Sequence, residues 1–460
     1  MLKKICLMAG VFILLWSFVL QPAMAEEDAV SREIITILYK NGDISDETRR
    51  ELLDKLEKAD PKKPVLNASW NNGMRLESED GAFKLQIGGR ILNDWAATHA
   101  DQSLEQAFDG QTLEGTGTEM RHARFCMGGI LYNQFTFKAD YDFAGTAANF
   151  KDVWIGLKNI PGLGELRVGH QKEPFSMETM NSLPYTTFME RGLPVAFVPG
   201  RNTGVTIHDS LSDGRLGWGV GVFKDVSDSD GFDDQSDYNV TGRVTGMLFA
   251  DEDRSRLVHL GAAYSHQFRD EENSLRYRSK PGANMAEVYV VDTGSIKGVT
   301  DVDLMGPEIA LVSGPFSVQA EYVHAWLNRT AADNLDFYGY YAFCSYFLTG
   351  EHRIYKMDEA GGEFSRMIPI RPFQFKGGGW GAWEVALRYG FMDGNDGEIQ
   401  GGQEQNYTLG VNWYMNPNLR VMFNYVLARI NDRDIVKSDA VTVIDGENTE
   451  SYMMRFQVDF

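Results

Sequence analysis

The sequence predicts an all-β protein, a 16-stranded antiparallel transmembrane β-barrel that follows a short N-terminal helical segment. Three observations lead to this prediction. Segments of about ten residues alternate between apolar and polar side chains, the connections between them are alternately short and long, and beyond residue 20 no stretch approaches the ~18 apolar residues of a spanning helix. The mean hydropathy of −0.31 fits such a barrel, because a polar and an apolar face average to a modest value.

Residues 1–25 have the pattern of a secretory signal peptide. Lys3 and Lys4 give a positively charged start, residues 6–20 are apolar, and an A-x-A cleavage site ends the segment. We therefore predict an exported protein, exclude this segment from the fold, and expect the mature chain in the cell outer membrane.

Residues 26–64 are predicted to form a separate, coiled-coil-like helical segment in the periplasm. Apolar residues recur at i, i+3 and i+4 spacing in SREIITILYK and again in SDETRRELLDKLEK. Ser45 or Asp46 is suited to cap the second helix. Both helices are too short to be stable alone. The segment is therefore a self-associating or envelope-contacting module over residues 26–60, or a spacer that folds when docked.

The barrel domain is predicted over residues 80–460. QFTFKADYDF shows its period of two most clearly, with Phe135 and Phe137 on one face and Lys138 and Asp140 on the other. Aromatic residues gather on the apolar faces, and the polar faces carry charged and amide side chains. The dry core of a soluble β-sandwich would not accept those polar groups unpaired, so the pattern favours a membrane barrel.

Short turns at one rim and long loops at the other are typical of an outer-membrane barrel. The long connections are predicted to include 172–200, 392–404 and 430–449, whereas NPN at 416–418 is a short turn. Sixteen strands place both ends of the barrel domain on the short-turn side. The run 348–379 departs from the pattern, because it is long where a short turn is due.

The chain ends on SYMMRFQVDF, another strand with two faces. Tyr452, Phe456 and Phe460 are predicted to face outward, and Arg455 is predicted to face the lumen. This strand must pair with the first one, FKLQIGGRIL, to close the barrel and remove both sheet edges.

Charge and motifs exclude several other classes of protein. A formal net charge of −21 argues against nucleic acid as a partner. There is no G-x-S-x-G motif, no histidine pair at metal spacing and no glycine loop that could cradle a phosphate before a helix. The acidic stretch 225–237 lacks the closing glutamate of a calcium loop. We predict no enzyme, no catalytic residue, no metal site and no cofactor.

Several segments resemble the phosphate-selective porins of the O and P type, and they occur in the same order along the chain. These segments are KLQIGGRILND (84–94), EMRHARFCMGGILYNQFTFKADYDF (119–143), RVGHQKEPFSMETMNSLPYTTFMERGLPVAFVPGRNTGV (167–205), YFLTGEHRIYK (346–356), GAWEVALRYGFMD (381–393) and YTLGVNWYMNPNLRVMFNYV (407–426). The resemblance extends from about residue 80 to residue 460 and is weakest over 225–330.

The resemblance implies a homotrimeric diffusion porin, surrounded by outer-membrane lipid, for small hydrophilic solutes and above all for anions such as phosphate. In that family the loop after the fifth strand folds into the lumen and narrows the water-filled pore, and here this loop is residues 172–199. The alternatives are a porin of cation or general selectivity and a structural protein that tethers the envelope through its N-terminal helices. A substrate-gated importer is disfavoured, because too few residues precede the barrel to form a plug domain.

Passage of anions requires basic side chains that face the lumen at successive depths. Strand parity, the inward loop and the resemblance together select nine pore-lining or anion-binding candidates: Arg90, Arg121, Arg124, Lys138, Arg167, Lys172, Arg191, Arg243 and Arg388. Arg121 and Arg124 have opposite parity, so one of them is expected to face outward. His122 is expected to be mostly neutral at pH 7. No strand carries a dense arginine cluster, so the sequence favours anions only slightly.

Overall fold

The computed structural model describes residues 25–58, 66–108, 111–211, 214–224, 237–330, 332–358, 361–437 and 440–460. The chain divides into two compact units, one that extends to Leu66 and one that runs from Asn67 to Phe460. The described helices include none that is both long enough and apolar enough to cross a membrane. The predicted signal peptide (apart from Ala25) and the acidic stretch 225–236 lie outside the described residues.

The first unit contains the two predicted helices, α2 (Ala25–Lys40) and α3 (Asp46–Lys58). The side chain of Ser45 caps α3 by accepting a hydrogen bond from the backbone N–H of Thr48 at 3.1 Å. Ile35 is buried, whereas Ile34 and Ile37 remain about half exposed. The hairpin therefore keeps an uncovered apolar stripe.

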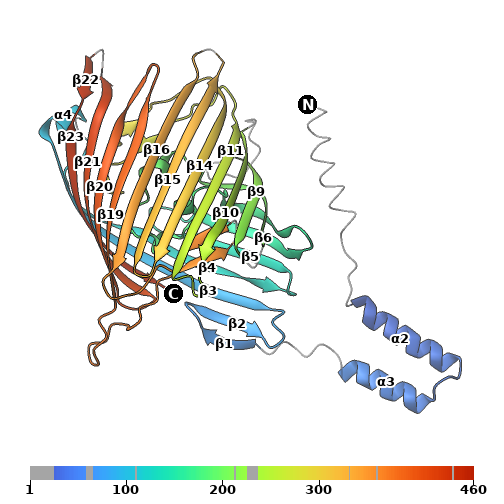
Figure 1. The fold of residues 1–460 in the computed structure, drawn as a ribbon. Helices are drawn as coiled ribbons and strands as arrows, with labels where there is room; N and C mark the ends of the chain where they lie inside the picture. Colours follow the sequence, from blue (N-terminus) through green and yellow to red (C-terminus); the bar gives the residue numbers. More distant parts are fainter. Residues whose placement is uncertain are drawn as a thin grey trace. The chain divides into compact units, whose positions relative to one another are not determined.

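Sixteen strands of the second unit form a closed antiparallel barrel, as predicted (Figure 1). Each barrel strand pairs with the next barrel strand along the chain, and β23 pairs with β3 to close the sheet. The barrel strands are β3 (Lys84–Ala100), β4 (Gly115–Leu131), β5 (Phe135–Asp142), β6 (Asn149–Ile160), β7 (Gly164–Lys172), β8 (Arg201–Leu211), β9 (Leu216–Lys224), β10 (Tyr238–Ala250), β11 (Arg256–Phe268), β14 (Val299–Ser313), β15 (Phe316–Arg329), β16 (Leu335–Phe347), β19 (Ala382–Asp396), β20 (Ile399–Tyr414), β21 (Leu419–Lys437) and β23 (Glu447–Asp459).

Smaller elements lie at the rims of the sheet and in its connections. They are β1 (Leu66–Trp70), β2 (Met74–Ser78), α4 (Gln102–Ala107), α5 (Met177–Met180), η1 (Leu183–Tyr185), η2 (Leu193–Ala196), β12 (Arg278–Ser279), β13 (Val291–Asp292), β17 (Tyr355–Asp358), β18 (Gly361–Phe364) and β22 (Ala440–Ile444). Because β2 pairs with β3, the sheet begins before residue 80, where the barrel domain was predicted to start.

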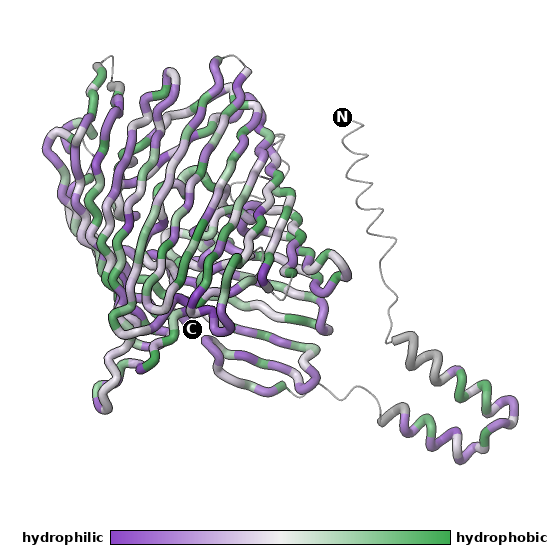
Figure 2. Tube along the Cα trace, in the orientation of Figure 1, coloured by the Kyte–Doolittle hydropathy of each residue, from purple (hydrophilic) through white to green (hydrophobic). Residues whose placement is uncertain are grey.

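The period of two in the sequence becomes the two faces of the barrel wall. Along β23, Tyr452 and Phe456 are 42% and 46% exposed, whereas Arg455 between them is fully buried. Hydrophobic and hydrophilic residues accordingly alternate along the strands (Figure 2). The inner face carries many charged side chains, and beside them a buried hydrophobic cluster packs inside the barrel around Phe175, Leu304 and Phe337.

The last residue completes the closing seam. The backbone N–H of Gly89 donates to the Phe460 carbonyl at 2.7 Å, and the Phe460 N–H donates back to Gly89 O at 2.9 Å. A Cβ at Gly88 would lie 2.4 Å from the carbonyl oxygen of Phe460. Glycine is therefore required at position 88 for the final strand to approach this closely.

Two connections that were predicted as long loops are strands, so that prediction was wrong. In place of the loop 392–404, β19 continues to Asp396 and β20 starts at Ile399. In place of the loop 430–449, β21 continues to Lys437. The apolar alternation stops before these strand ends, because both faces of a strand that rises above the apolar band can be polar. The backbone hydrogen bonds between these strands continue beyond the point where the alternation stops.

The segment 348–379 lies on the rim that carries the short turns, and part of it enters the barrel. Its hairpin, β17–β18, contacts inward-facing side chains of the wall: Arg243 Nη2 donates to the Gly362 carbonyl at 2.9 Å, and His259 Nδ1 lies 2.7 Å from the Tyr355 hydroxyl. This connection is long because it fills part of the lumen.

The connection between β7 and β8, residues 173–200, also folds into the lumen. Glu173 accepts hydrogen bonds from Asn202 and Asn239 at one end of the connection, both at 2.7 Å. Further along, the Met189 N–H donates to Asn424 Oδ1 of β21 at 2.8 Å. The connection thus spans the lumen from β8 to β21, and we call it the inward loop.

Candidate functional site

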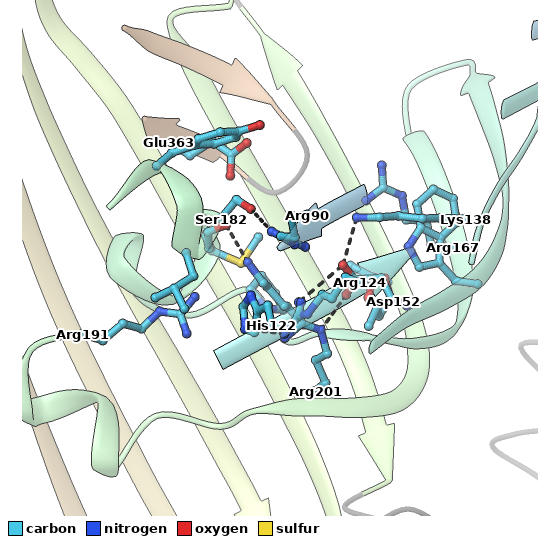
Figure 3. A pocket seen from close by; sticks show the side chains of 18 of the residues that line it. Arg90, His122, Arg124, Lys138, Asp152, Arg167, Ser182, Arg191, Arg201 and Glu363 are labelled. Carbon is cyan, nitrogen blue, oxygen red and sulfur yellow. Dashed lines mark hydrogen bonds and ion pairs between the residues drawn. The ribbon is translucent and has the colours of Figure 1, made fainter. Parts of the chain in front are cut away.

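A polar cavity of about 280 Å³ lies beside the inward loop, and basic side chains dominate its lining (Figure 3). Nine of the residues that line it are basic: Arg90, Arg121, Arg124, Lys138, Arg167, Lys172, Arg191, Arg201 and Lys356. Among the described residues that line this cavity, Asp152 and Glu363 are the only carboxylates. The wall side of the cavity comes from β3 to β8, the inward loop contributes Arg191, and the β17–β18 hairpin contributes Lys356 and Glu363.

A bulge in β4 brings Arg121 and His122 into the barrel together with Arg124. Opposite β3, His122 pairs with Leu92 and Met120 pairs with Asn93, so Arg121 is the extra residue on β4. A bulge shifts side-chain parity by one residue. Arg121 and Arg124 therefore both line the cavity, and the expectation that one of them faces outward was wrong.

The inward loop is held by arginines on strands β19, β21 and β23, the last of which pairs with β3. Arg388 on β19, Arg420 on β21 and Arg455 on β23 each donate to a loop carbonyl, those of Glu190, Thr186 and Met189, at 2.7–2.8 Å. These guanidinium groups satisfy the backbone of a segment that has no sheet of its own. The open space is consequently on the β3–β8 side of the loop.

Glutamates on β14 and β15 bind the N–H groups that start α5. Glu308 accepts from Met177 N at 2.9 Å, and Glu321 accepts from Glu178 N at 2.7 Å. The side chains of these two glutamates are buried. The inward loop is thus attached to the wall by acceptors as well as donors, which fixes the shape of the cavity.

Several cavity cations are matched by carboxylates of the wall or the loop. Arg121 makes a two-pronged pair with Glu190 at 2.9 Å, and Arg124 donates to Asp142 at 2.7 Å. Arg90 lies 3.2 Å from Asp140. These pairs orient the guanidinium groups and reduce the positive field of the cavity.

Other cavity cations are held by a shared carboxylate or by an aromatic ring. Asp152 pairs with both Lys138, at 2.9 Å, and Arg201, at 2.8 Å. Arg167 donates to Glu165 at 2.8 Å, and its guanidinium carbon lies 4.2 Å from the centre of the Trp154 ring. Two cations on one carboxylate leave a positive excess at that point of the wall.

Lys172 and Arg191 have a different environment from the other cavity cations. Lys172 Nζ donates to the carbonyls of Met180 and Asn181 at 2.8 and 3.3 Å, and Arg191 Nη2 donates to that same Asn181 carbonyl at 3.1 Å. Within the described residues, no carboxylate forms an ion pair with either side chain. Burial lowers the pKa of Arg191 to about 10, which leaves its guanidinium charged at neutral pH. The two basic side chains lie close together, and no carboxylate of the described residues pairs with either of them.

His122 is neutral, as expected, and its hydrogen bond shows the reason. Its Nε2 lies 2.9 Å from Arg124 Nη2. A guanidinium group only donates, so Nε2 must accept and the proton must be on Nδ1. Nδ1 is buried and has no hydrogen-bond partner within the described part of the chain. His122 therefore adds no charge to the lining of the cavity.

Comparisons with known proteins agree with the fold described above. The family model for phosphate-selective porins O and P matches residues 95–460. The chain belongs to this family. Porin O of Pseudomonas aeruginosa is 25% identical over 430 residues, which cover 84% of this chain and 91% of that protein. An uncharacterised protein of Caulobacter vibrioides is 27% identical over 378 residues, 80% of this chain and 73% of its own.

The solved structures support the same fold. An anion-selective porin from Comamonas acidovorans superposes with a TM-score of 0.53 at 13% identity, covering 82% of this chain and 100% of that one. Family and fold together make the protein a porin of the outer membrane, with the fold of a channel and not that of an enzyme.

Seven of the nine candidate residues of the porin lie around the cavity, and two do not. Arg243 is buried on β10, where it pairs with Glu308 and holds the β17–β18 hairpin. Arg388 is buried on β19, where it holds the inward loop. Both residues face inward, as their parity predicted, but other protein segments cover them. We therefore remove Arg243 and Arg388 from the anion-binding set.

Sequence reasoning missed two cavity cations of the porin. Arg201 is the first residue of β8, directly after the inward loop, and that position next to the constriction was the signal that could have identified it. Lys356 belongs to the β17–β18 hairpin, within the run 348–379 whose unusual length was the available signal. The length alone does not indicate that this hairpin enters the lumen.

Proposed function

We propose that this porin passes small hydrophilic anions, inorganic phosphate among them, through the basic cavity beside the inward loop. One observation carries the proposal: nine basic side chains line the cavity against two carboxylates, and Lys172 and Arg191 among them have backbone carbonyls in place of a counter-charge. An anion at this point supplies the missing charge. Phosphate suits such a site, because its oxygens accept several charge-assisted hydrogen bonds at once.

A second cavity extends the basic route toward the long-loop rim. It has a volume of about 490 Å³ and shares Arg201 with the first cavity. Lys151, Arg269 and Arg276 also line it. Basic groups at successive depths let an ion pass from one to the next, provided that no single site holds it too tightly. Arg201 and Arg276 already form ion pairs with carboxylates, which weakens anion binding at each of them and so allows the anion to leave.

The acidic composition of the chain does not oppose this route. The formal net charge of −21 belongs to the whole chain, whereas an ion in a narrow pore responds mainly to charges within about a Debye length, ~8–10 Å at physiological salt. The stretch 225–237 alone contains six aspartates, so a large part of the acidic charge is concentrated in one segment of the sequence.

Planar-bilayer recordings on the purified porin test the proposal. In a salt gradient the reversal potential is expected to have the sign of an anion-preferring pore, and millimolar phosphate is expected to reduce the chloride current. A cation-preferring reversal potential that phosphate leaves unchanged would refute phosphate passage and establish a cation or general porin.

We also propose that the porin is a homotrimer, as in the family that it resembles. β5 has eight residues, fewer than the nine to eleven of a typical spanning strand. The outward side chains Phe135, Phe143 and Ile155 on and beside this strand are exposed. A neighbouring subunit over this low part of the wall would cover them.

Replacing Phe460 by Asp is expected to reduce the amount of heat-modifiable trimer in the outer membrane. The change places a charge on the outward face at the end of the closing strand, next to its pairing with Gly89. Semi-native gels of membrane fractions measure the effect, and Phe460→Tyr is the matched control. Normal trimer levels in the Asp variant would contradict the role of this residue in closure.

We further propose that residues 26–64 act as a periplasmic accessory unit. The half-exposed Ile34 and Ile37 on α2 support a role in self-association or envelope contact. Deleting residues 26–60 distinguishes an accessory unit from a tether as the main function, since conductance survives the deletion in the first case and envelope attachment fails in the second.

A further inference from the structure

Two arginines and two carboxylates form a compact network where the inward loop meets the seam of the barrel. Arg121 on β4 binds both oxygens of Glu190, each at 2.9 Å. Arg455 on β23 lies 3.0 Å from the same carboxylate and donates to both oxygens of Asp94 at 2.6 and 2.7 Å. The four charges cancel.

The members of this network differ in how far they reach the open cavity. Arg455 is fully buried and Asp94 nearly so. The side chains of Arg121 and Glu190 are 24% and 20% exposed. Arg121 is therefore the member of the network that lines the cavity, Glu190 is its partly exposed counter-charge next to the lining, and Arg455–Asp94 is the buried anchor.

Glu190 stays ionised over the working range of a porin. Burial by itself would raise the pKa of this carboxyl, but Arg121 and Arg455 lower it to about 2. A charged carboxylate thus faces every anion that approaches Arg121.

We propose that Glu190 is a specificity-determining counter-charge, which occupies Arg121 and so limits how tightly the cavity binds an anion. This inference rests on the proposed anion passage through the same cavity. An anion must compete with the Glu190 carboxylate for Arg121, while Lys172 and Arg191 remain open to it. A pore needs this balance, because an ion that meets every cation unopposed binds too tightly to leave.

The position of Glu190 separates it from the other carboxylates around the cavity. Asp140, Asp142 and Asp152 belong to the wall strands β5 and β6. Glu190 belongs to the loop that crosses the lumen, and its carbonyl is held by Arg388 on β19. Its carboxylate is therefore brought to Arg121 by the loop and not by a neighbouring wall strand, and only this fold of the loop creates the pair.

The test is Glu190→Gln, which keeps the shape and a hydrogen-bond acceptor for the two arginines but removes the charge. In planar bilayers the variant is expected to shift the reversal potential further toward anion preference. Half-block of the chloride current by inorganic phosphate is expected at a roughly tenfold lower concentration, the effect of one unit charge removed at close range. Glu398→Gln removes an equal charge from the exposed turn between β19 and β20 and is expected to change neither quantity.

Asp94→Asn distinguishes a counter-charge from a structural anchor. It weakens the hold on Arg455 but leaves the Arg121–Glu190 pair intact. If Glu190→Gln and Asp94→Asn raise the conductance and lower the anion preference to the same extent, Glu190 acts as a structural anchor and the inference is wrong. If the native porin shows no anion preference but Glu190→Gln gains one, the proposed function fails and the role of Glu190 stands. If the native porin prefers anions but Glu190→Gln shifts neither the reversal potential nor the phosphate block, the inference about Glu190 is wrong while the proposed function stands.

Discussion

Replacing Lys172 and Arg191 together by glutamine is expected to abolish phosphate block at millimolar concentrations and to remove any anion preference. Each charge-assisted hydrogen bond contributes about 1.5–3 kcal/mol. Losing two of them weakens phosphate binding on the order of a hundredfold or more. Glutamine keeps a donor for the loop carbonyls that these side chains now bind, so the fold of the inward loop is preserved. Reversal potential and phosphate titration of the chloride current measure the effect.

The matched control is Arg371→Gln combined with Lys376→Gln, on the exposed rim segment between β18 and β19. This pair removes the same total charge far from the cavity lining. Selectivity should be unchanged in the control. Equal loss of selectivity in both double variants would mean that overall charge, and not a site at Lys172 and Arg191, sets the preference of the pore.

Replacing Arg455 by Met is expected to destabilise the barrel and to loosen the inward loop. The change leaves Asp94 buried without its partner and deprives the Met189 carbonyl of its donor. Removing one member of a buried ion pair typically costs about 3–5 kcal/mol, so the free energy of unfolding should fall by about that amount. Single-channel conductance should rise, because a loop that is free on one side no longer narrows the pore.

Denaturant titration followed by the gel shift of the folded barrel measures the stability, and bilayer recording measures the conductance. The double variant Arg455→Met with Asp94→Leu removes the orphaned charge and should recover much of the stability but not the native conductance. Native conductance in Arg455→Met would show that the remaining contacts, among them those of Arg388 and Arg420, hold the loop unaided.

The alternation of side chains was sufficient to predict the barrel, its strand number and its closing seam. A wall with lipid on one side and water on the other imposes a period of two on every strand that it contains. Tyr452 and Arg455 consequently face the way that their parity predicts. The alternation is lost where a strand extends beyond the lipid, and for that reason the ends of β19 to β21 were mistaken for loops.

Parity also predicts which side chains face inward, but not which of them contact solvent in the lumen. Arg243 and Arg90 have the same inward orientation, yet the β17–β18 hairpin covers the first and the cavity reaches the second. At Arg121, a single bulge inverts the expected orientation. Bulges and loop paths depend on contacts between distant segments, which no local pattern records.

The amino-acid sequence was sufficient to predict the class of the protein, the wall of the barrel and the residues from which a pore could be built. The alternation of side chains is visible within each short segment, so a strand can be recognised without knowing which segments lie next to it in the fold. Which cations lie together depends on the path of the chain through the lumen. The tertiary structure bound the inward loop to β19–β23, drew the 348–379 segment into the lumen, and placed Glu190 against Arg121. These pairings join segments that lie tens to hundreds of residues apart, so their energies arise only once the barrel has closed.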